Sequence, residues 1–386
     1  MKKIFKSADI LLPKAHVDLE KWSVVACDQH TSNLAFWSET EEIVDGKPST
    51  LELILPEVYL EDANLFGRIK MIQTKMDEYV SGGLFDTIKD SIIFVERRQA
   101  DGRFRYGVVG VVDLEEYDFK LGSKSLIRAT EGTIEERIPP RLVLREKARL
   151  ELPHIMLLVD DSKQEIIESL HPQLVPEQMV YSLELMQQGG HIAGYKLSEE
   201  QKEHVENCIA RIAETSPIAL AVGDGNHSLA TAKVHWENLR KKLAPSELEN
   251  HPARYALVEI VNLHSPALVF EPIHRVMMGI NKVHVLTELE KSGCDTNDVG
   301  ALQVFIDDYI VKHGGTVDYI HGADAARELG ARPNNIEFLL PAMDKFDLFP
   351  LIQDGPLPRK AFSMGDSIHG KQEDKRYYLE AREIVK

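Results

Sequence analysis

The stretch from Ile218 to Lys233 constrains the fold more than any other part of this sequence. It opens with an unbroken apolar run, residues 218–222, which is long enough for one buried strand. Gly223-Asp224-Gly225 follows and is expected to break the strand, because glycine reaches backbone angles that other residues avoid. Residues 229–233 are typical of the first turns of a helix. The sequence therefore predicts a strand, a glycine turn and a helix start within 218–233.

This turn has the chemistry of an anion-binding site. The N–H groups at a helix start point outward, and the helix dipole favours negative charge there. The turn also carries an acid, an amide, an imidazole and a hydroxyl, on Asp224, Asn226, His227 and Ser228. Two interpretations remain open. The turn binds a ligand, or Asp224 or Asn226 simply caps the helix while His227 is half-buried.

Strand and helix patterns alternate along the chain and predict a mixed α/β fold. Residues 64–80 have apolar side chains at helical spacing, and residues 154–160 form an apolar strand pattern. Ser198-Glu199-Glu200-Gln201 is a capping box that begins a further helix before the strand at 218–222. We therefore expect mixed sheets with flanking helices.

A hairpin and a division of the chain are also expected. Asp101-Gly102 lies between the β-rich runs 91–96 and 104–114, which is a hairpin signal. Glu96 and the arginine pair that follows have two interpretations: a functional role, or the solvated hairpin end that such charges more often form. We expect an N-terminal α/β region at 1–160 and a second region at 161–386, with one compact unit as the alternative.

Composition excludes several classes of partner. The chain has 386 residues and a formal net charge of −17, which disfavours nucleic acid and anionic membrane surfaces but leaves room for a local pocket for one phosphorylated ligand. No apolar run approaches the ~20 residues of a membrane span. Cys27, Cys208 and Cys294 have no C-x-x-C spacing and favour a reducing compartment. We expect a cytoplasmic protein.

Three other segments carry polar groups in positions typical of sites. Asp28-Gln29-His30 follows the apolar run 24–27, and Thr130-Glu131-Gly132-Thr133 is flanked by arginines at 128, 137 and 141. Residues 349–365 show little periodicity and contain Arg359, Lys360 and Ser363. Hydroxyls and cations in ordered loops suit a phosphorylated ligand.

The chain resembles a known protein family at several of these residues. Asp224-Gly225-Asn226-His227, Glu271-Pro272-Ile273-His274-Arg275 and the loop from Leu357-Pro358-Arg359-Lys360 to Ser363-Met364-Gly365 are similar to the bacterial and archaeal domain-of-unknown-function family ten-fifteen. The resemblance runs along nearly the whole chain. The family has no established activity, so the resemblance implies a fold and a set of residues but no reaction.

A more distant resemblance concerns the central turn. The family's common form, D-G-H-H-R, is similar to the turn of the ParB and sulfiredoxin-like fold, in which the turn and helix start hold nucleotide phosphates. The archaeal free serine kinase of that superfamily uses the turn for phosphoryl transfer. Here Asn226 and Ser228 replace the family's His and Arg. Charge type alone offers Arg275, Arg359, Lys360 and Lys233 as cations that could replace this arginine.

These observations favour a protein that binds a nucleotide or a phosphorylated small molecule and acts as a small-molecule phosphotransferase. In this hypothesis Asp224 or Glu131 holds Mg²⁺ or acts as base, with His227 near the transferred group. The ligand is held by Gly223, Gly225, Asn226, Ser228, Arg275, Arg359, Lys360 and Ser363. One alternative is a metal-dependent hydrolase with ligands from Asp28, His30, Asp224, His227, His264 and His274. The other is a non-catalytic ligand-binding or regulatory protein.

Overall fold

The computed structural model describes residues 2–25, 34–60, 62–99, 101–133, 138–152, 155–364 and 376–385. The chain divides into two compact units. Unit 1 comprises Met1–Ala129, Thr133–Leu268 and Gln372–Lys386, and unit 2 comprises Thr130–Gly132 and Val269–Lys371. Residues 160 and 161, between which the sequence placed a boundary, both lie in unit 1.

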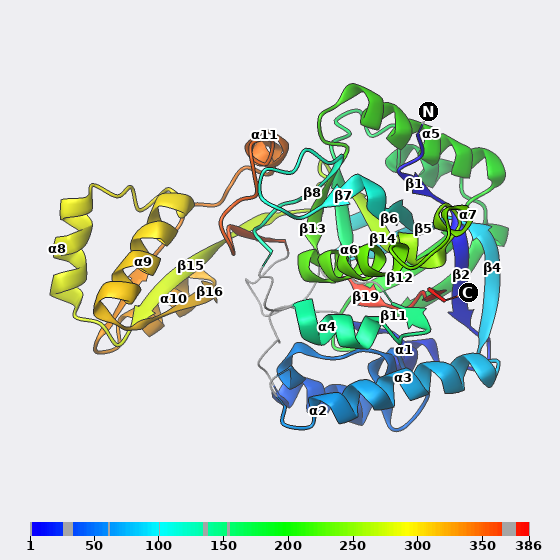
Figure 1. Cartoon of the computed structure of the whole chain (residues 1–386), viewed down its shortest axis with the longest axis horizontal. Helices are drawn as coiled ribbons and strands as arrows, with labels where there is room; N and C mark the ends of the chain where they lie inside the picture. The colour runs from blue at the N-terminus through cyan, green and yellow to red at the C-terminus, as the bar shows by residue number, and fades with distance from the viewer. Residues whose placement is uncertain are drawn as a thin grey trace. The chain divides into compact units, whose positions relative to one another are not determined.

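The described residues of unit 1 form a ten-stranded mixed sheet (Figure 1). Its strands are β1 (Phe5–Lys6), β5 (Ile93–Arg98), β6 (Phe104–Asp113), β7 (Tyr117–Asp118), β8 (Ile127–Ala129), β10 (Met156–Val159), β11 (Met179–Glu184), β12 (His191–Lys196), β13 (Leu220–Asp224) and β14 (Tyr255–Asn262). The order is β11-β12-β5-β6-β14-β10-β13-β8-β7, with β1 beside β6. Strand β10 is parallel to β14, and β8 is parallel to β7 and β13; the other pairs are antiparallel. The expected mixed α/β fold is confirmed, and β5 and β6 form the expected hairpin.

Each face of this sheet has its own apolar core, because successive strand residues point to opposite faces. One core joins Ile93 and Leu257 of the sheet to Trp22 and Ile72, and the other joins Phe94 and Val258 to residues of the helices that follow β12 and β13. The helices of unit 1 are α1 (Leu19–Trp22), α2 (Leu34–Val44), α3 (Leu65–Ser81), α4 (Ile138–Arg145), α5 (Glu199–Thr215), α6 (Asn226–Arg240) and α7 (Pro245–Leu248). Helix α3 confirms the helix expected at 64–80, with Ile69, Ile72 and Met76 buried.

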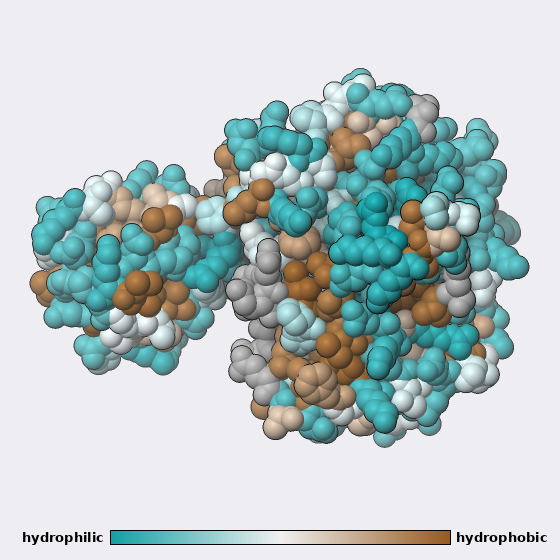
Figure 2. Space-filling model, viewed as in Figure 1, coloured by the Kyte–Doolittle hydropathy of each residue, from teal (hydrophilic) through white to brown (hydrophobic). Residues whose placement is uncertain are grey.

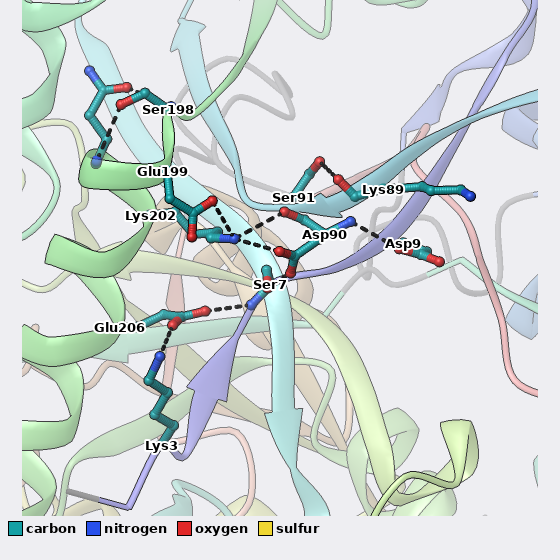
Figure 3. A network of polar contacts seen from close by, with 11 residues as sticks. Lys3, Ser7, Asp9, Lys89, Asp90, Ser91, Ser198, Glu199, Lys202 and Glu206 are labelled. Atoms are coloured by element: carbon teal, nitrogen blue, oxygen red, sulfur yellow. Dashed lines mark hydrogen bonds and ion pairs between the residues drawn. The ribbon is translucent and has the colours of Figure 1, made fainter.

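Helix α5 begins at the expected capping box. Ser198 Oγ accepts from the Gln201 N–H at 3.3 Å, and Gln201 Oε1 accepts from the Ser198 N–H at 2.9 Å. Beyond the cap, Lys202 Nζ lies 2.6 Å from Asp90 Oδ2 and 2.9 Å from Glu199 Oε2 (Figure 3). This network joins α5 to the end of β4 (Phe85–Ser91), which pairs with β2 (Ala8–Pro13).

The segment 376–385 belongs to unit 1, although the whole of Val269–Lys371 precedes it in unit 2. It adds β19 (Tyr377–Tyr378) to β3 (Val24–Val25) and β20 (Arg382–Glu383) to β9 (Leu150–Glu151). Between these strands the Leu379 carbonyl accepts a hydrogen bond from Trp22 Nε1 at 3.0 Å. Residues from the end of the chain therefore complete the core formed by its beginning.

Unit 2 has its own small sheet (Figure 1). It also has its own apolar core. Strand β15 is paired antiparallel with three others, and the core contains Met277, Val285, Leu302 and Ile306. Its elements are β15 (Phe270–Met278), α8 (Lys282–Ser292), α9 (Val299–His313), β16 (Thr316–His321), α10 (Ala323–Gly330), β17 (Asn335–Phe338), α11 (Leu348–Leu351) and β18 (Phe362–Met364).

The viewed surface of each unit is largely hydrophilic, with smaller brown apolar areas (Figure 2). Among the described residues, none of the helices combines the length and the apolar character that crossing a membrane requires.

Candidate functional site

The central turn joins the end of β13 directly to α6. Strand β13 includes Gly223 and Asp224, so the expectation that these residues break the strand is wrong. Gly225 alone makes the turn, with a left-handed φ of +84°, and it is the N-cap of α6. A Cβ atom at this position would lie 3.0 Å from Ile155 Cα. Both the backbone conformation and the close approach therefore require glycine at 225.

Gly225 has no side chain, so it supplies no side-chain cap to the first N–H groups of α6. Its carbonyl accepts the Leu229 N–H at 3.0 Å, and its own N–H donates to Asp224 Oδ1 at 2.8 Å. Asp224 is therefore turned toward the Gly225 N–H and is not the N-cap residue. The interpretation of Asp224 or Asn226 as a simple helix cap does not describe this helix start.

The four polar side chains of the turn, on Asp224, Asn226, His227 and Ser228, are all half-buried. The Asn226 Oδ1 atom is buried and accepts no hydrogen bond from the described residues. A buried acceptor without a donor is unfavourable by about 1–3 kcal/mol, so this amide is suited to a donor from a ligand or from water. The sequence predicted Asn226 as a ligand-binding residue of the turn, and its unsatisfied buried oxygen is the feature that only the structure reveals.

Lys233 does not supply the cation that the turn lacks. Its Nζ donates to the Leu114 carbonyl at 2.9 Å and lies 2.9 Å from Glu237 Oε1. The charge of this lysine is already paired one turn further along α6.

The remaining predicted site residues belong to unit 2, where two motifs meet. Leu357 N–H donates to the Thr130 carbonyl at 2.8 Å, and Gly132 N–H donates to the Leu357 carbonyl at 3.3 Å. Glu131 thus lies beside the L-P-R-K loop as a bridge partner of Leu357. The sequence identified both segments but gave no sign that they pair.

Arg275 of β15 is hydrogen-bonded to the backbone of this loop. Its guanidinium is fully buried, donates to the Arg359 carbonyl at 3.0 Å and to Gln303 Oε1 at 3.3 Å, and lies 5.0 Å from the centre of the Tyr319 ring. Burial lowers the pKa of Arg275 to about 10. Because these donors serve protein oxygens, Arg275 positions the loop more than it offers a free phosphate clamp.

The other cations and hydroxyls of the loop have different exposure. Arg359 is exposed, donates to Asp307 Oδ1 at 2.8 Å and lies 5.5 Å from the Tyr319 ring. Lys360 is half-buried with a left-handed φ of +57°. Ser363 is buried and pairs with Glu271 between β18 and β15. Their roles in binding stay predictions.

Metal ligands do not cluster among the described residues, where no group of three His, Cys, Asp or Glu side chains could hold an ion. His264 Nε2 lies 2.7 Å from Asp160 Oδ1, and His274 Nδ1 accepts from the Leu340 N–H at 3.1 Å. Asp28 and His30 lie outside the described residues, as do Cys27 and Arg137. Asp224, a single carboxylate, fits Mg²⁺ only where phosphate oxygens and water complete the coordination.

Sequence reasoning missed a buried group of charges in unit 1. Arg97, Arg105, Glu259, Arg376 and Glu380 are all 0% exposed. The interpretation that the charged end of the 91–96 hairpin strand is solvated is therefore wrong for Arg97, whose Nη2 donates to the Gly189 carbonyl at 2.8 Å. One signal was available: Glu259 interrupts the apolar run of β14, Y-A-L-V-E-I-V-N.

Comparisons with known proteins bear mainly on the family. No curated protein matches the chain. A conserved hypothetical protein from Pyrococcus furiosus is 9% identical, with a TM-score of 0.35 over 70% of this chain and 94% of that one. A free serine kinase in complex with AMP is 12% identical, with a TM-score of 0.38 over 70% of this chain and 90% of the kinase. Similarity at this level defines neither a shared function nor the ParB or sulfiredoxin-like fold, which stays a prediction.

The family model with the description "Protein of unknown function (DUF1015)" matches residues 9–346. That range includes the central turn and the Glu131 loop, and it ends before the L-P-R-K loop and the segment 376–385. The chain belongs to the DUF1015 family.

Proposed function

We propose that this protein binds a nucleotide or another phosphorylated small molecule at the 223–228 turn, with its phosphate at the start of α6. The observation that carries the proposal is the helix start itself: a long helix begins at an uncapped glycine, directly after a buried strand. Such a start presents N–H groups and about half a positive elementary charge to an anion.

Two side chains support a specific ligand over any anion. Asn226 Oδ1 requires a donor, which an inorganic anion lacks and a ligand hydroxyl or amino group provides. Asp224 repels a bare phosphate, so we propose that Mg²⁺ accompanies the ligand and is bound by this carboxylate together with phosphate oxygens. Mg²⁺, when bound, neutralises phosphate charge. His227, in the first turn of α6, is the proposed base for an acceptor hydroxyl if the phosphate is transferred.

A thermal-shift screen of the untagged protein against ATP, ADP, AMP, CTP and GTP, with and without Mg²⁺, tests this proposal. Unfolding of unit 1 can be followed separately, because Trp22, Trp37 and Trp236 all lie in that unit. A ligand at about one hundred times its Kd stabilises the folded state by about 2.7 kcal/mol, which raises the Tm by several degrees.

The variants N226A and D224N locate the effect. We expect N226A to lose the shift and D224N to lose its dependence on Mg²⁺. The control S198A removes the cap of α5, another helix start in unit 1, and should lower the basal Tm without changing the shift. A flat screen with millimolar nucleotides, or a shift that survives in N226A and D224N together, contradicts the proposal.

A further inference from the structure

Among the described residues, the group of buried charges in unit 1 contains a carboxylate, that of Glu259, whose oxygens accept no hydrogen bond. Glu259 is 0% exposed, and neither of its oxygens is hydrogen-bonded by the described residues. The nearest cations are Arg376 Nε, 3.3 Å from Oε2, and Arg105 Nη2, 3.6 Å from Oε1. The carboxylate is therefore paired in charge and still able to accept hydrogen bonds.

Two other buried acids of unit 1 show what a satisfied carboxylate looks like in this protein. Glu151 accepts from Arg382 Nε at 2.8 Å, the Leu257 N–H at 2.9 Å and Arg145 Nη2 at 2.7 Å. Glu380 accepts from Tyr181 Oη at 2.6 Å and from Arg376 Nη2 at 2.7 Å. Glu259 differs from both although it is buried at least as deeply.

Arg376 has complementary unsatisfied atoms. Its Nη2 is used by Glu380, while Nε and Nη1 donate no hydrogen bond to the described residues, and the side chain is 0% exposed. One of these two atoms, Nε, lies 3.3 Å from Glu259 Oε2. Buried charged groups in this state are costly unless a further group satisfies them.

The Glu259 carboxylate occupies space that a side chain at a neighbouring glycine would fill. A Cβ atom at Gly107, on the adjacent β6, would collide with the Glu259 carboxylate. The arginines also restrict what can bind: a metal ion or an amine is repelled by Arg376 and Arg105. A hydroxyl group suits the site, because it donates to Glu259 and accepts from Arg376.

Register connects this pair to the proposed ligand turn. Met156 of β10 is the partner of Asp224 on one side and of Glu259 on the other, so these residues form one row across the sheet. Glu259 lies two strand spacings from Asp224, or about 10 Å along the backbone row. Ile155 contacts both the turn and β14: its Cα lies close to Gly225, and its carbonyl accepts the Glu259 N–H at 3.0 Å.

We infer that Glu259 and Arg376 bind a hydroxyl-bearing part, such as a sugar, of the phosphorylated ligand whose phosphate lies at the 223–228 turn. This inference rests on the proposed function and narrows it to phosphorylated polyols, including the ribose of a nucleotide. Because both side chains are buried, ligand binding requires local opening of unit 1, and we expect slow association.

The test compares AMP with 2′,3′-dideoxy-AMP by equilibrium binding to the full chain, with inorganic phosphate as a third probe. We expect the wild type to bind AMP about tenfold more tightly than the dideoxy compound, the value of one hydrogen bond to a charged group. The variants E259Q, which keeps the size of the side chain, and R376K should reduce this preference to about twofold or less. The matched control E151Q removes another buried, arginine-paired charge of unit 1 and should keep the preference.

The outcomes separate the inference from the function on which it rests. Equal binding of AMP and the dideoxy compound by the wild type, or a preference that persists in E259Q, overturns the inference and leaves phosphate binding at the turn intact. In either case, internal water rather than the ligand would supply the hydrogen bonds that the Glu259 carboxylate accepts. Failure of the wild type to bind any of the three probes overturns the proposed function as well.

Discussion

His235 should make unit 1 less stable as the pH falls, and the size of the effect follows from its position. This histidine is half-buried on α6. Burial, followed by the positive charge of Arg145, lowers the pKa of His235 to about 4. The unfolded chain, with a histidine pKa of about 6.5, therefore binds a proton in a range where the folded chain does not. The stabilisation is complete above about pH 6.5 and is lost as the pH falls toward 4.

The pKa difference sets an upper limit on the loss of folding free energy, and solvent screening reduces it. A difference of about 2.5 pH units at 1.36 kcal/mol per unit gives about 3.4 kcal/mol. Because the side chain is only half-buried, solvent screening reduces this to about 1–2 kcal/mol. The variant H235Q keeps a polar side chain of similar size and cannot titrate.

Urea unfolding followed by tryptophan fluorescence, at several values between about pH 7 and about pH 4, measures this difference. We expect the wild type to lose about 1–2 kcal/mol more than H235Q over this range. The control H16Q changes an exposed histidine of the same unit and should follow the wild type. If H235Q loses stability as steeply as the wild type, the buried histidine is not the cause and the reasoning is refuted.

Three further predictions concern stability. G225A should destabilise unit 1 by about 2–3 kcal/mol in urea, against about 1 kcal/mol for G102A, because both glycines have left-handed φ values but only Gly225 has a close neighbour. K202M should cost about 1 kcal/mol at neutral pH, since it removes two ion pairs whose acidic partners are exposed. The hydrogen bond from Lys202 lowers the pKa of Asp90, so this contribution is present above about pH 4 and is lost as the pH falls; D90N should be less sensitive in that range. Deletion of residues 372–386 should abolish the cooperative unfolding of unit 1 seen by tryptophan emission, and a normal transition in that truncated chain would contradict the role given to the segment.

Sequence patterns predicted the local elements because their causes are local. The apolar spacing of α3, the capping box of α5 and the Asp101-Gly102 hairpin each depend on residues within one or two turns. The end of β13 was misplaced, since Gly223 and Asp224 remain in the strand through pairing with β10. Only Gly225 has the backbone angle that the sequence assigned to the whole turn.

The parts of the site that the sequence did not reveal depend on non-local pairing. Asp224 and Glu259 share a row only because β10 lies between β13 and β14, an order that no periodicity predicts. Residue type also gave a wrong expectation of exposure for the buried arginines, because charged residues are almost always exposed unless they are paired. Arg97 donates to the distant Gly189 carbonyl, and Arg376 pairs with the distant Glu259 as well as with the nearby Glu380, so no local pattern marks either arginine as interior.

The return of residues 376–385 to unit 1 has a consequence for synthesis on the ribosome. The core around Trp22 needs Tyr377 and Leu379, and these residues emerge only after Val269–Lys371 has been translated. Unit 2 is continuous apart from Thr130–Gly132 and can gather its core earlier. During translation, the N-terminal part of unit 1 therefore exposes some of its apolar surface until residues 376–385 have been synthesised. Nascent-chain aggregation, and the need for a holding chaperone, should be greatest in that interval.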